Sequence, residues 1–233
     1  SYVPHFEYYD YGHQYMVAKN IQKNYNRYIN NLRVLDTILQ RVVQIVDARG
    51  LLERTIFVFV GDHGEAFEQH LGNRTHSRFS YEENLKTPAL FFGPTFIPAR
   101  RVQEYTSHVD ILPTLLDAMG IPYNEELFQG ESLFTDRRRR QYIFAAGNEN
   151  TYSAISVDGI KVQALYASDE CRAFDLNHDA LEKKPLSCDG FSDERHALLR
   201  FKHFQTQALL DYNVAAKAGD AFHGHRHPPP KKR

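Results

Sequence analysis

The sequence lacks the features that would mark a membrane protein, a disulfide scaffold or a polyanion-binding protein. No stretch of the 233 residues approaches the roughly 18 apolar residues of a membrane helix, and no basic, apolar, small-residue signal opens the chain. The 28 Lys and Arg residues nearly balance the 29 Asp and Glu residues, so net charge favours neither nucleic acid nor an anionic membrane as a partner. Two cysteines, Cys171 and Cys188, are too few for a scaffold. They leave open one extracytoplasmic disulfide or two free thiols.

Two basic stretches stand out against this balance. Residues 137–140 are four arginines, and the chain ends in HGHRHPPPKKR. We interpret the first as a solvated loop and residues 216–233 as a disordered basic, Pro-rich tail. The opening residues SYVPHFEYYDYG read like the middle of a longer sequence. A signal or membrane anchor upstream of Ser1 therefore stays open.

The first 135 residues carry the pattern of an α/β domain. Apolar residues three and four apart predict an amphipathic helix over 15–48 that ends at Gly50. The runs 55–60 and 88–92 are apolar without alternation, which is typical of buried parallel strands. Another helix is predicted over 106–119. We therefore expect residues 1–135 to form an α/β layer with a mostly parallel sheet.

After residue 120 the sequence pattern changes to short candidate strands, which predicts a separate subdomain over 136–215. Short strands are expected at 141–146, 152–157 and 160–166, and Asp158-Gly159 is a hairpin turn. A helix over about 194–212 is expected to pack across this small antiparallel sheet.

The chemistry gathers where the run 55–60 ends. The apolar residues stop at Gly61, and Asp62 and His63 follow, so a carboxylate and an imidazole are held at the carboxyl end of a strand. Ligands gather at that edge of open parallel sheets, and both groups can bind a divalent metal. The glycines at 61 and 64 would permit the sharp turn that brings both side chains to one ion. His76 lies in the same long loop, which has the length of a functional loop.

These stretches, taken together, resemble the sulfatase branch of the alkaline phosphatase superfamily, with its phosphoethanolamine-transferase and lipoteichoic-acid-synthase-like relatives. Five segments occur in the family's order: GLLERTIFVFVGDHGE, THSRFSYEENLKTPALFFGP, SHVDILPTLLDAMGI, FQGESLF and KVQALYASDECRAFDLNHDALEK. The resemblance implies an alkaline-phosphatase-like α/β three-layer sandwich whose N-terminal part is absent here. The small antiparallel sheet with its packed helix would follow it.

The resemblance also implies roles for four residues. Asp62 and His63 match the pair that ligates the catalytic metal. His76 matches a histidine that contacts the phosphoryl or sulfuryl group, and His5 in VPHFEY is similar to another histidine that faces the anion. A divalent cation would neutralise the transferred group, and imidazoles can supply a proton near neutral pH. Asp110, at the start of the 106–119 helix, is expected to cap that helix rather than bind the metal.

The family's nucleophile is missing from this sequence. A sulfatase uses a cysteine in C-x-P-x-R or C-x-A-x-R, whereas Cys171 begins CRAFD and Cys188 begins CDGF. The phosphotransferases use threonine or serine in the N-terminal part. We therefore expect the chain to be the C-terminal part of a catalytic domain, inactive by itself and holding a metal weakly.

Three functions remain open at this point. The first is a metal-dependent sulfuric ester hydrolase with Ca²⁺. The second is a phosphoethanolamine or glycerol-phosphate transferase, or a phosphodiesterase, for which Zn²⁺ or Mn²⁺ suits His63 better. The third is a non-catalytic module that binds an anionic glycan or lipid headgroup. In each, the partner is a sulfate or phosphate ester and not a nucleic acid. The resemblance implies an extracytoplasmic location: periplasm, lysosome or cell surface.

Overall fold

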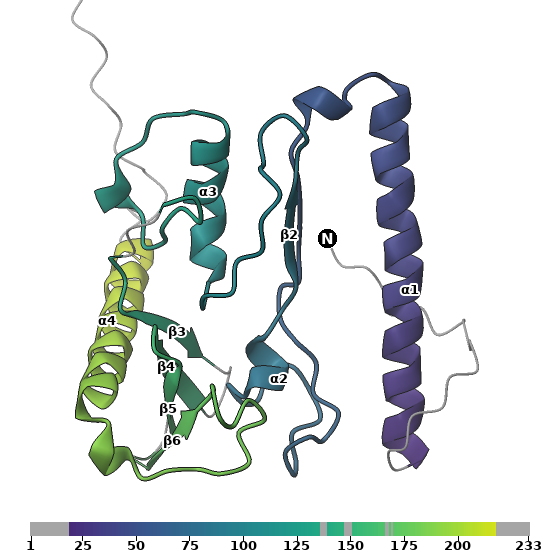
Figure 1. The fold of residues 1–233 in the computed structure, drawn as a ribbon. Coiled ribbons are helices and arrows are strands. Elements are labelled where there is room, and N and C mark those ends of the chain that lie inside the picture. The colour runs from purple at the N-terminus through teal and green to yellow at the C-terminus, as the bar shows by residue number, and fades with distance from the viewer. Residues whose placement is uncertain (1–18, 136–138, 147–150, 166–167, 169, 218–233) are drawn as a thin grey trace, which may run out of the picture.

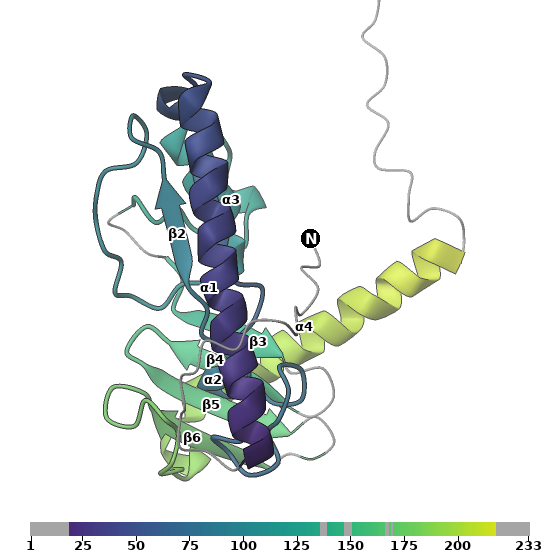
Figure 2. The same cartoon turned by 90° about the vertical axis from the view of Figure 1, so that its right-hand side faces the viewer.

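The computed structural model describes residues 19–135, 139–146, 151–165, 168 and 170–217. Within them a long helix, α1, stands beside a two-stranded sheet, and a four-stranded sheet lies below with helix α4 against it (Figure 1). Figure 2 shows the same molecule from the side of α1. No helix in the described ranges is long and apolar enough to cross a bilayer.

Helix α1 spans Lys19–Ala48, close to the predicted range. The turn that follows it contains Gly50, whose φ of +66° is the left-handed conformation that favours glycine at a helix end. The phenol rings of Tyr25 and Tyr28 contact Phe67, with ring centroids 5.0 and 5.3 Å away. This contact brings α1 onto the loop that follows β1.

The strands β1 (Phe57–Val60) and β2 (Ala89–Phe92) pair antiparallel, so the prediction that they lie parallel is wrong. The last residue of β1, Val60, is opposite the first residue of β2, Ala89. Residues 61–88 therefore leave and re-enter the sheet at the same end. A parallel pair needs a crossover connection that carries the chain back to the other end of the sheet, usually through an α-helix. The loop contains only the four-residue helix α2 (Glu82–Leu85), and it returns as a wide hairpin connection.

The helix predicted over 106–119 begins with a 3₁₀ turn at His108–Asp110 and continues as α3, Ile111–Ala118. Ser107 is the N-cap of this turn and Asp110 is the third residue of its capping box, because the backbone N–H of Ser107 donates to Oδ2 of Asp110 at 2.8 Å. The Asp110 carboxylate also accepts two hydrogen bonds of 2.7 Å from the guanidinium of Arg140. This bidentate pair ties α3 to the chain entering the second sheet.

The second sheet has the order β3-β4-β5-β6 and every neighbouring pair is antiparallel. Its strands are β3 (Tyr142–Ala146), β4 (Thr151–Ser156), β5 (Ile160–Leu165) and β6 (Cys171–Asp175). The first three were predicted from the sequence, and β6 was not. The hairpin turn at Asp158-Gly159 is confirmed, with Gly159 at φ +83°. Helix α4 (Ser192–Lys217) packs on this sheet as expected.

A disulfide joins Cys171 to Cys188, which settles the alternative that the sequence left open. It links β6 to the 3₁₀ turn Cys188–Gly190 just before α4. The bridge therefore holds the helix connection to the edge strand of the sheet.

Both faces of the four-stranded sheet are covered. On one face Val162 and Ala154 lie in a cluster with Leu198 of α4. On the other face Ile155 and Phe174 pack with Tyr81, which immediately precedes α2. The loop between β1 and β2 is thus anchored in the core of the second sheet.

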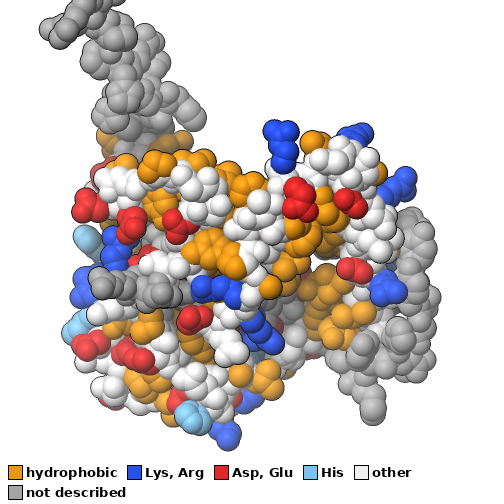
Figure 3. Space-filling model, turned by 45° about the horizontal axis from the view of Figure 1, so that its top comes forward, with side chains coloured by type: hydrophobic (Ala, Val, Ile, Leu, Met, Phe, Trp, Pro, Cys, Tyr) orange, Lys and Arg blue, Asp and Glu red, His pale blue; other side chains and the backbone are white. Residues whose placement is uncertain are grey.

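Acidic and basic side chains are interspersed over the described part of the face in Figure 3, as the balanced composition predicts. The division at residue 135 stays a prediction. Of the tail predicted over 216–233, residues 216 and 217 belong to α4, and 218–233 lie outside the described residues. Of the predicted solvated loop at 137–140, only 139 and 140 are described, and the Arg140 side chain is 14% exposed because it pairs with Asp110.

Candidate metal centre

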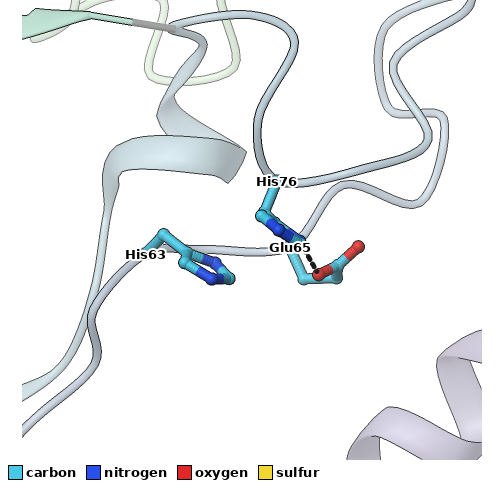
Figure 4. A group of neighbouring side chains, drawn as sticks. All are labelled: His63, Glu65 and His76. Atoms are coloured by element: carbon cyan, nitrogen blue, oxygen red, sulfur yellow. Dashed lines mark hydrogen bonds and ion pairs between the residues drawn. The ribbon is translucent and has the colours of Figure 1, made fainter. Parts of the chain in front are cut away.

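Three side chains from the loop after β1 lie together: His63, Glu65 and His76. One potential ligand atom from each is within 4.8 Å of the other two. Figure 4 shows the two imidazoles lying one over the other, with the Glu65 carboxylate beside His76. The ring centroids of His63 and His76 are 4.0 Å apart and the planes are 17° from parallel. The predicted meeting of residues 63 and 76 is therefore observed.

The hydrogen bonds leave a nitrogen free on each imidazole. Nδ1 of His63 lies 2.8 Å from the carbonyl oxygen of Gly64, which can only accept a hydrogen bond, so Nδ1 carries the proton. Nδ1 of His76 lies 3.1 Å from Oε2 of Glu65 and donates to that carboxylate. In the neutral tautomers Nε2 of both rings is then available as a metal ligand or proton acceptor.

Asp62 lies at the rim of this cluster. Its side chain is 90% exposed, and Oδ2 is 3.6 Å from Nε2 of His63. The backbone N–H of His63 donates to Oδ1 of Asp62 at 3.1 Å. The carboxylate and the imidazole thus face each other, as two ligands of one ion would, and the metal role of this pair stays a prediction. His5, the fourth predicted site residue, lies outside the described residues.

Asn84 of α2 forms hydrogen bonds with the two loop segments that carry His63 and His76. Its backbone carbonyl accepts from the N–H of Gly64 at 2.7 Å, between His63 and Glu65. Its side-chain amide donates to the carbonyl of Thr75 at 2.5 Å, next to His76. Because Asn84 is 2% exposed, water competes little for these two hydrogen bonds.

The two glycines flank the bend at Asp62 and His63 without adopting a left-handed backbone conformation. Neither Gly61 nor Gly64 has a positive φ. A Cβ on Gly64 would lie 2.2 Å from the carbonyl oxygen of Glu83, so glycine is required there because the backbone of α2 approaches closely. At Gly61 a Cβ would meet the Cβ of Thr87 at 3.1 Å. The chain does bend at Asp62 and His63, between the two glycines. Close packing, rather than a positive φ, requires glycine at position 64.

Neighbouring groups shape the electrostatics. Burial raises the pKa of the Tyr28 phenol, and the negative charge of Glu65 adds to the effect. Tyr28 therefore stays a neutral phenol beside the cluster. His108 contacts the carbonyl of Gly61 through Nε2 at 2.7 Å and so holds the end of β1 from the other side.

The residues fit a divalent cation by the chemistry of their donors. Two imidazole nitrogens and a carboxylate are a common ligand set for Zn²⁺ and Mn²⁺, while Asp62 and Glu65 offer the oxygen atoms that Ca²⁺ prefers. Donor atoms around one ion at about 2.0–2.6 Å lie roughly 3–5 Å from one another, which matches the observed cluster.

Glu65 is the member of the cluster that sequence reasoning missed. It stands two residues after His63, in the same GDHGE stretch. In non-helical chain, residues i and i+2 tend to share a side, and that spacing was the available signal. His70 was also missed, since its partner Glu182 is 112 residues away along the chain. Asn84 was missed although its partner Thr75 lies in the same loop, because nothing in the sequence distinguishes it from the other polar residues there.

A family profile described as Sulfatase matches residues 2–121 of this chain. Among curated proteins, Arylsulfatase K of Xenopus laevis is 30% identical over 122 residues, which is 52% of this chain and 21% of that protein. The human Arylsulfatase K is 33% identical over 92 residues, covering 40% of this chain and 17% of that protein. The Ulvan-active sulfatase of Formosa agariphila is 31% identical over 136 residues, covering 57% and 21%. The match spans about a fifth of each relative's length.

Solved structures show the same fold. A protein in complex with its substrate D-glucosamine-2-N,6-O-disulfate has a TM-score of 0.61 at 22% identity, covering 82% of this chain and 42% of that chain. A 2-O GAG sulfatase has a TM-score of 0.59 at 22% identity, covering 86% and 45%. These likenesses confirm the predicted alkaline-phosphatase-like α/β fold with its small antiparallel sheet and packed helix. The family profile covers just over half of the residues, and the chain belongs to the sulfatase family.

Proposed function

We propose that this chain supplies the metal-binding side of a sulfatase-type active site that hydrolyses sulfate esters. The observation that carries the proposal is the meeting of His63, Glu65 and His76 at the end of β1 in a chain of the sulfatase family. Asp62 completes the set from the rim. The nucleophile is not among these residues, because neither cysteine stands in C-x-P-x-R.

The chain's own residues would divide the work in a defined way. Asp62 and His63 would hold a divalent cation, which when bound would neutralise the charge of the sulfuryl oxygens. His76, kept in one tautomer by Glu65, would present Nε2 to the anion or to the leaving oxygen. His5 would be a second imidazole facing the anion.

A sulfated sugar is the substrate class that we propose. Its support is that one structural neighbour was solved with a disulfated glucosamine as its substrate, and that one curated relative is an ulvan-active sulfatase. We also propose an extracytoplasmic site of action. The Cys171–Cys188 disulfide supports it, because such bonds persist mainly in oxidising compartments.

The test is metal binding, which does not depend on turnover. Thermal unfolding of the chain is followed with and without Ca²⁺, Mn²⁺ and Zn²⁺. We expect at least one cation to raise the melting temperature, because binding to the folded state alone stabilises it. Asp62→Ala, His63→Ala and His76→Ala are expected to reduce or abolish that rise. By itself the chain is expected to show no turnover of an aryl sulfate.

His178→Ala is the matched control. His178 is an exposed histidine paired with Asp175 at 2.8 Å, outside the cluster. This variant should keep the full metal-dependent rise. If His63→Ala also keeps it, the metal assignment is wrong.

A further inference from the structure

Three charged side chains meet in the interior between the second sheet and the candidate metal centre. Nζ of Lys161 on β5 lies 2.8 Å from Oε1 of Glu182 and 3.0 Å from Oε1 of Glu82. The side chains of Lys161 and Glu182 are 0% exposed and that of Glu82 is 18% exposed. Buried charges are kept only where they are paired, so this triad specifies one relative position for the three segments.

Glu182 contributes more than its charge. Its Oε2 accepts a hydrogen bond of 2.6 Å from the backbone N–H of Glu82, at the first residue of α2. Its backbone carbonyl accepts from Nε2 of His70 at 3.0 Å. Its φ of +53° is rare for a residue with a side chain, so the surrounding contacts hold it in place. Burial raises the pKa of the Glu182 carboxyl, while the charge of Lys161 acts in the opposite direction.

The next step of the path runs from the triad to Asn84. Glu83 accepts at Oε1 from Nδ1 of His70 at 2.7 Å and from the amide of Asn73 at 2.9 Å. The same amide of Asn73 donates to the side-chain oxygen of Asn84 at 2.5 Å. The short helix α2 is thereby held on one side by the second sheet and on the other by its own loop.

Asn84 then contacts both segments that carry the imidazoles of the site. It binds the N–H of Gly64 and the carbonyl of Thr75, which adjoin His63 and His76. A shift of α2 would move these two anchor points together with the imidazoles. The four-stranded sheet is therefore connected to the candidate centre by a continuous series of buried and partly buried contacts.

We propose that Lys161 and Glu182 are positioning residues for the His63–Glu65–His76 cluster, acting through α2 and Asn84. The metal-binding purpose of the cluster rests on the proposed function above. The positioning itself belongs to the chain without metal. It is therefore tested separately.

The experiment measures hydrogen exchange of the Gly64 amide by NMR in the metal-free chain. The Gly64 N–H donates to the carbonyl of Asn84, so its exchange rate reports how often this hydrogen bond opens. Lys161→Met and Glu182→Gln are compared with the unchanged chain. We expect Gly64 to exchange about tenfold faster or more in both variants, while amides of β4 and β5 stay protected.

Val162→Ala is the matched control for lost stability. Val162 follows Lys161 on β5, is 0% exposed, and faces the cluster with Leu198 on the opposite side of the sheet. It weakens the same sheet without touching α2. If Val162→Ala accelerates Gly64 as much as Lys161→Met does, the effect is general loosening and the proposal is wrong. Unchanged exchange at Gly64 in both charge variants also overturns it.

Glu182→Gln guards against a variant that does not fold. It keeps the shape of the side chain and an oxygen that can accept from Glu82, so it preserves the packing while removing the charge. Metal titration of the same samples separates the two proposals. Faster Gly64 exchange without any metal binding by the unchanged chain supports positioning and contradicts the proposed function. Metal binding by the unchanged chain, together with unaltered Gly64 exchange in both charge variants, supports the proposed function and contradicts the positioning role.

Discussion

The two sheets of this molecule contrast in composition and burial. The strands of the first sheet read FVFV and ALFF, yet Val60 is 40% exposed, Leu90 57% and Phe92 37%. The central strand β4 of the second sheet reads TYSAIS and every one of its residues is buried. Hydrophobicity along the chain therefore does not rank the strands by burial. Burial follows from what packs on each face.

The buried polar residues of the second sheet are accommodated by pairing. Oγ1 of Thr151 accepts from the backbone N–H and the hydroxyl of Ser80 at 2.7 and 2.9 Å. The Ser80 hydroxyl also meets that of Ser153 at 2.7 Å and the amide of Gln163 at 3.2 Å. Satisfied hydroxyls cost little to bury, and here they also fasten the site loop to the sheet.

The largest expected effect sharpens this contrast between the sheets. Phe174→Ala removes a ring that is 1% exposed, from the face of the sheet that receives Tyr81. We expect it to lower the free energy of unfolding by about 3–5 kcal/mol. Urea denaturation followed by circular dichroism measures the change.

Leu90→Ala on β2 is the counterpart, and should cost less than about 1 kcal/mol because the side chain is 57% exposed. A cost close to that of Phe174→Ala would break the comparison. It would mean that the first sheet is covered in solution.

An intermediate effect is expected for the buried hydroxyls. Thr151→Val keeps the shape of the side chain but leaves the N–H of Ser80 without its acceptor. We expect a loss of about 1–3 kcal/mol in unfolding free energy. Thr206→Val is the control, since the Thr206 hydroxyl donates to the carbonyl of Lys202 on an exposed helix face. Equal losses in the two variants would show that the buried hydroxyls of Thr151, Ser80 and Ser153 stabilise the fold no more than an exposed hydroxyl does.

The smallest expected effect is a change in pH dependence. Burial raises the pKa of Glu182 above its ordinary value of 4.5. A carboxyl with a raised folded-state pKa contributes its full stability below the ordinary value, and this contribution is lost as the pH rises through the folded-state pKa. Glu182→Gln cannot titrate. The stability advantage of the unchanged chain over this variant should therefore shrink as the pH rises above 4.5, in urea denaturation from pH 4 to 8. An advantage that grows with pH would contradict the raised pKa.

Local patterns predicted much of the secondary structure. The apolar spacing and Gly50 placed α1, and Asp158-Gly159 placed the hairpin between β4 and β5. Strand β6 was missed because CRAFD carries two charges in five residues and no apolar run. The predicted parallel orientation of β1 and β2 was wrong, because the apolar content of two strands does not show whether they run in the same or in opposite directions.

The candidate site was predicted in part. The order of the motifs singled out His63 and His76, which the structure brings together, and Asp62, which it places at the rim. Glu65 and Asn84 had no signal strong enough to stand out from a polar loop. Lys161 would have been assigned to the surface, because lysine is rarely buried without partners and its partners are 79 and 21 residues away.

The amino-acid sequence alone determined the family, the presence of the helices α1, α3 and α4, and the carboxylate and imidazoles that follow β1. Such features depend on residues near one another along the chain. Only the tertiary structure decided that Glu65 joins the histidines and that a buried lysine on β5 is linked to them through α2. Contacts between distant segments depend on three-dimensional packing, and the burial that makes those charges matter exists only after folding.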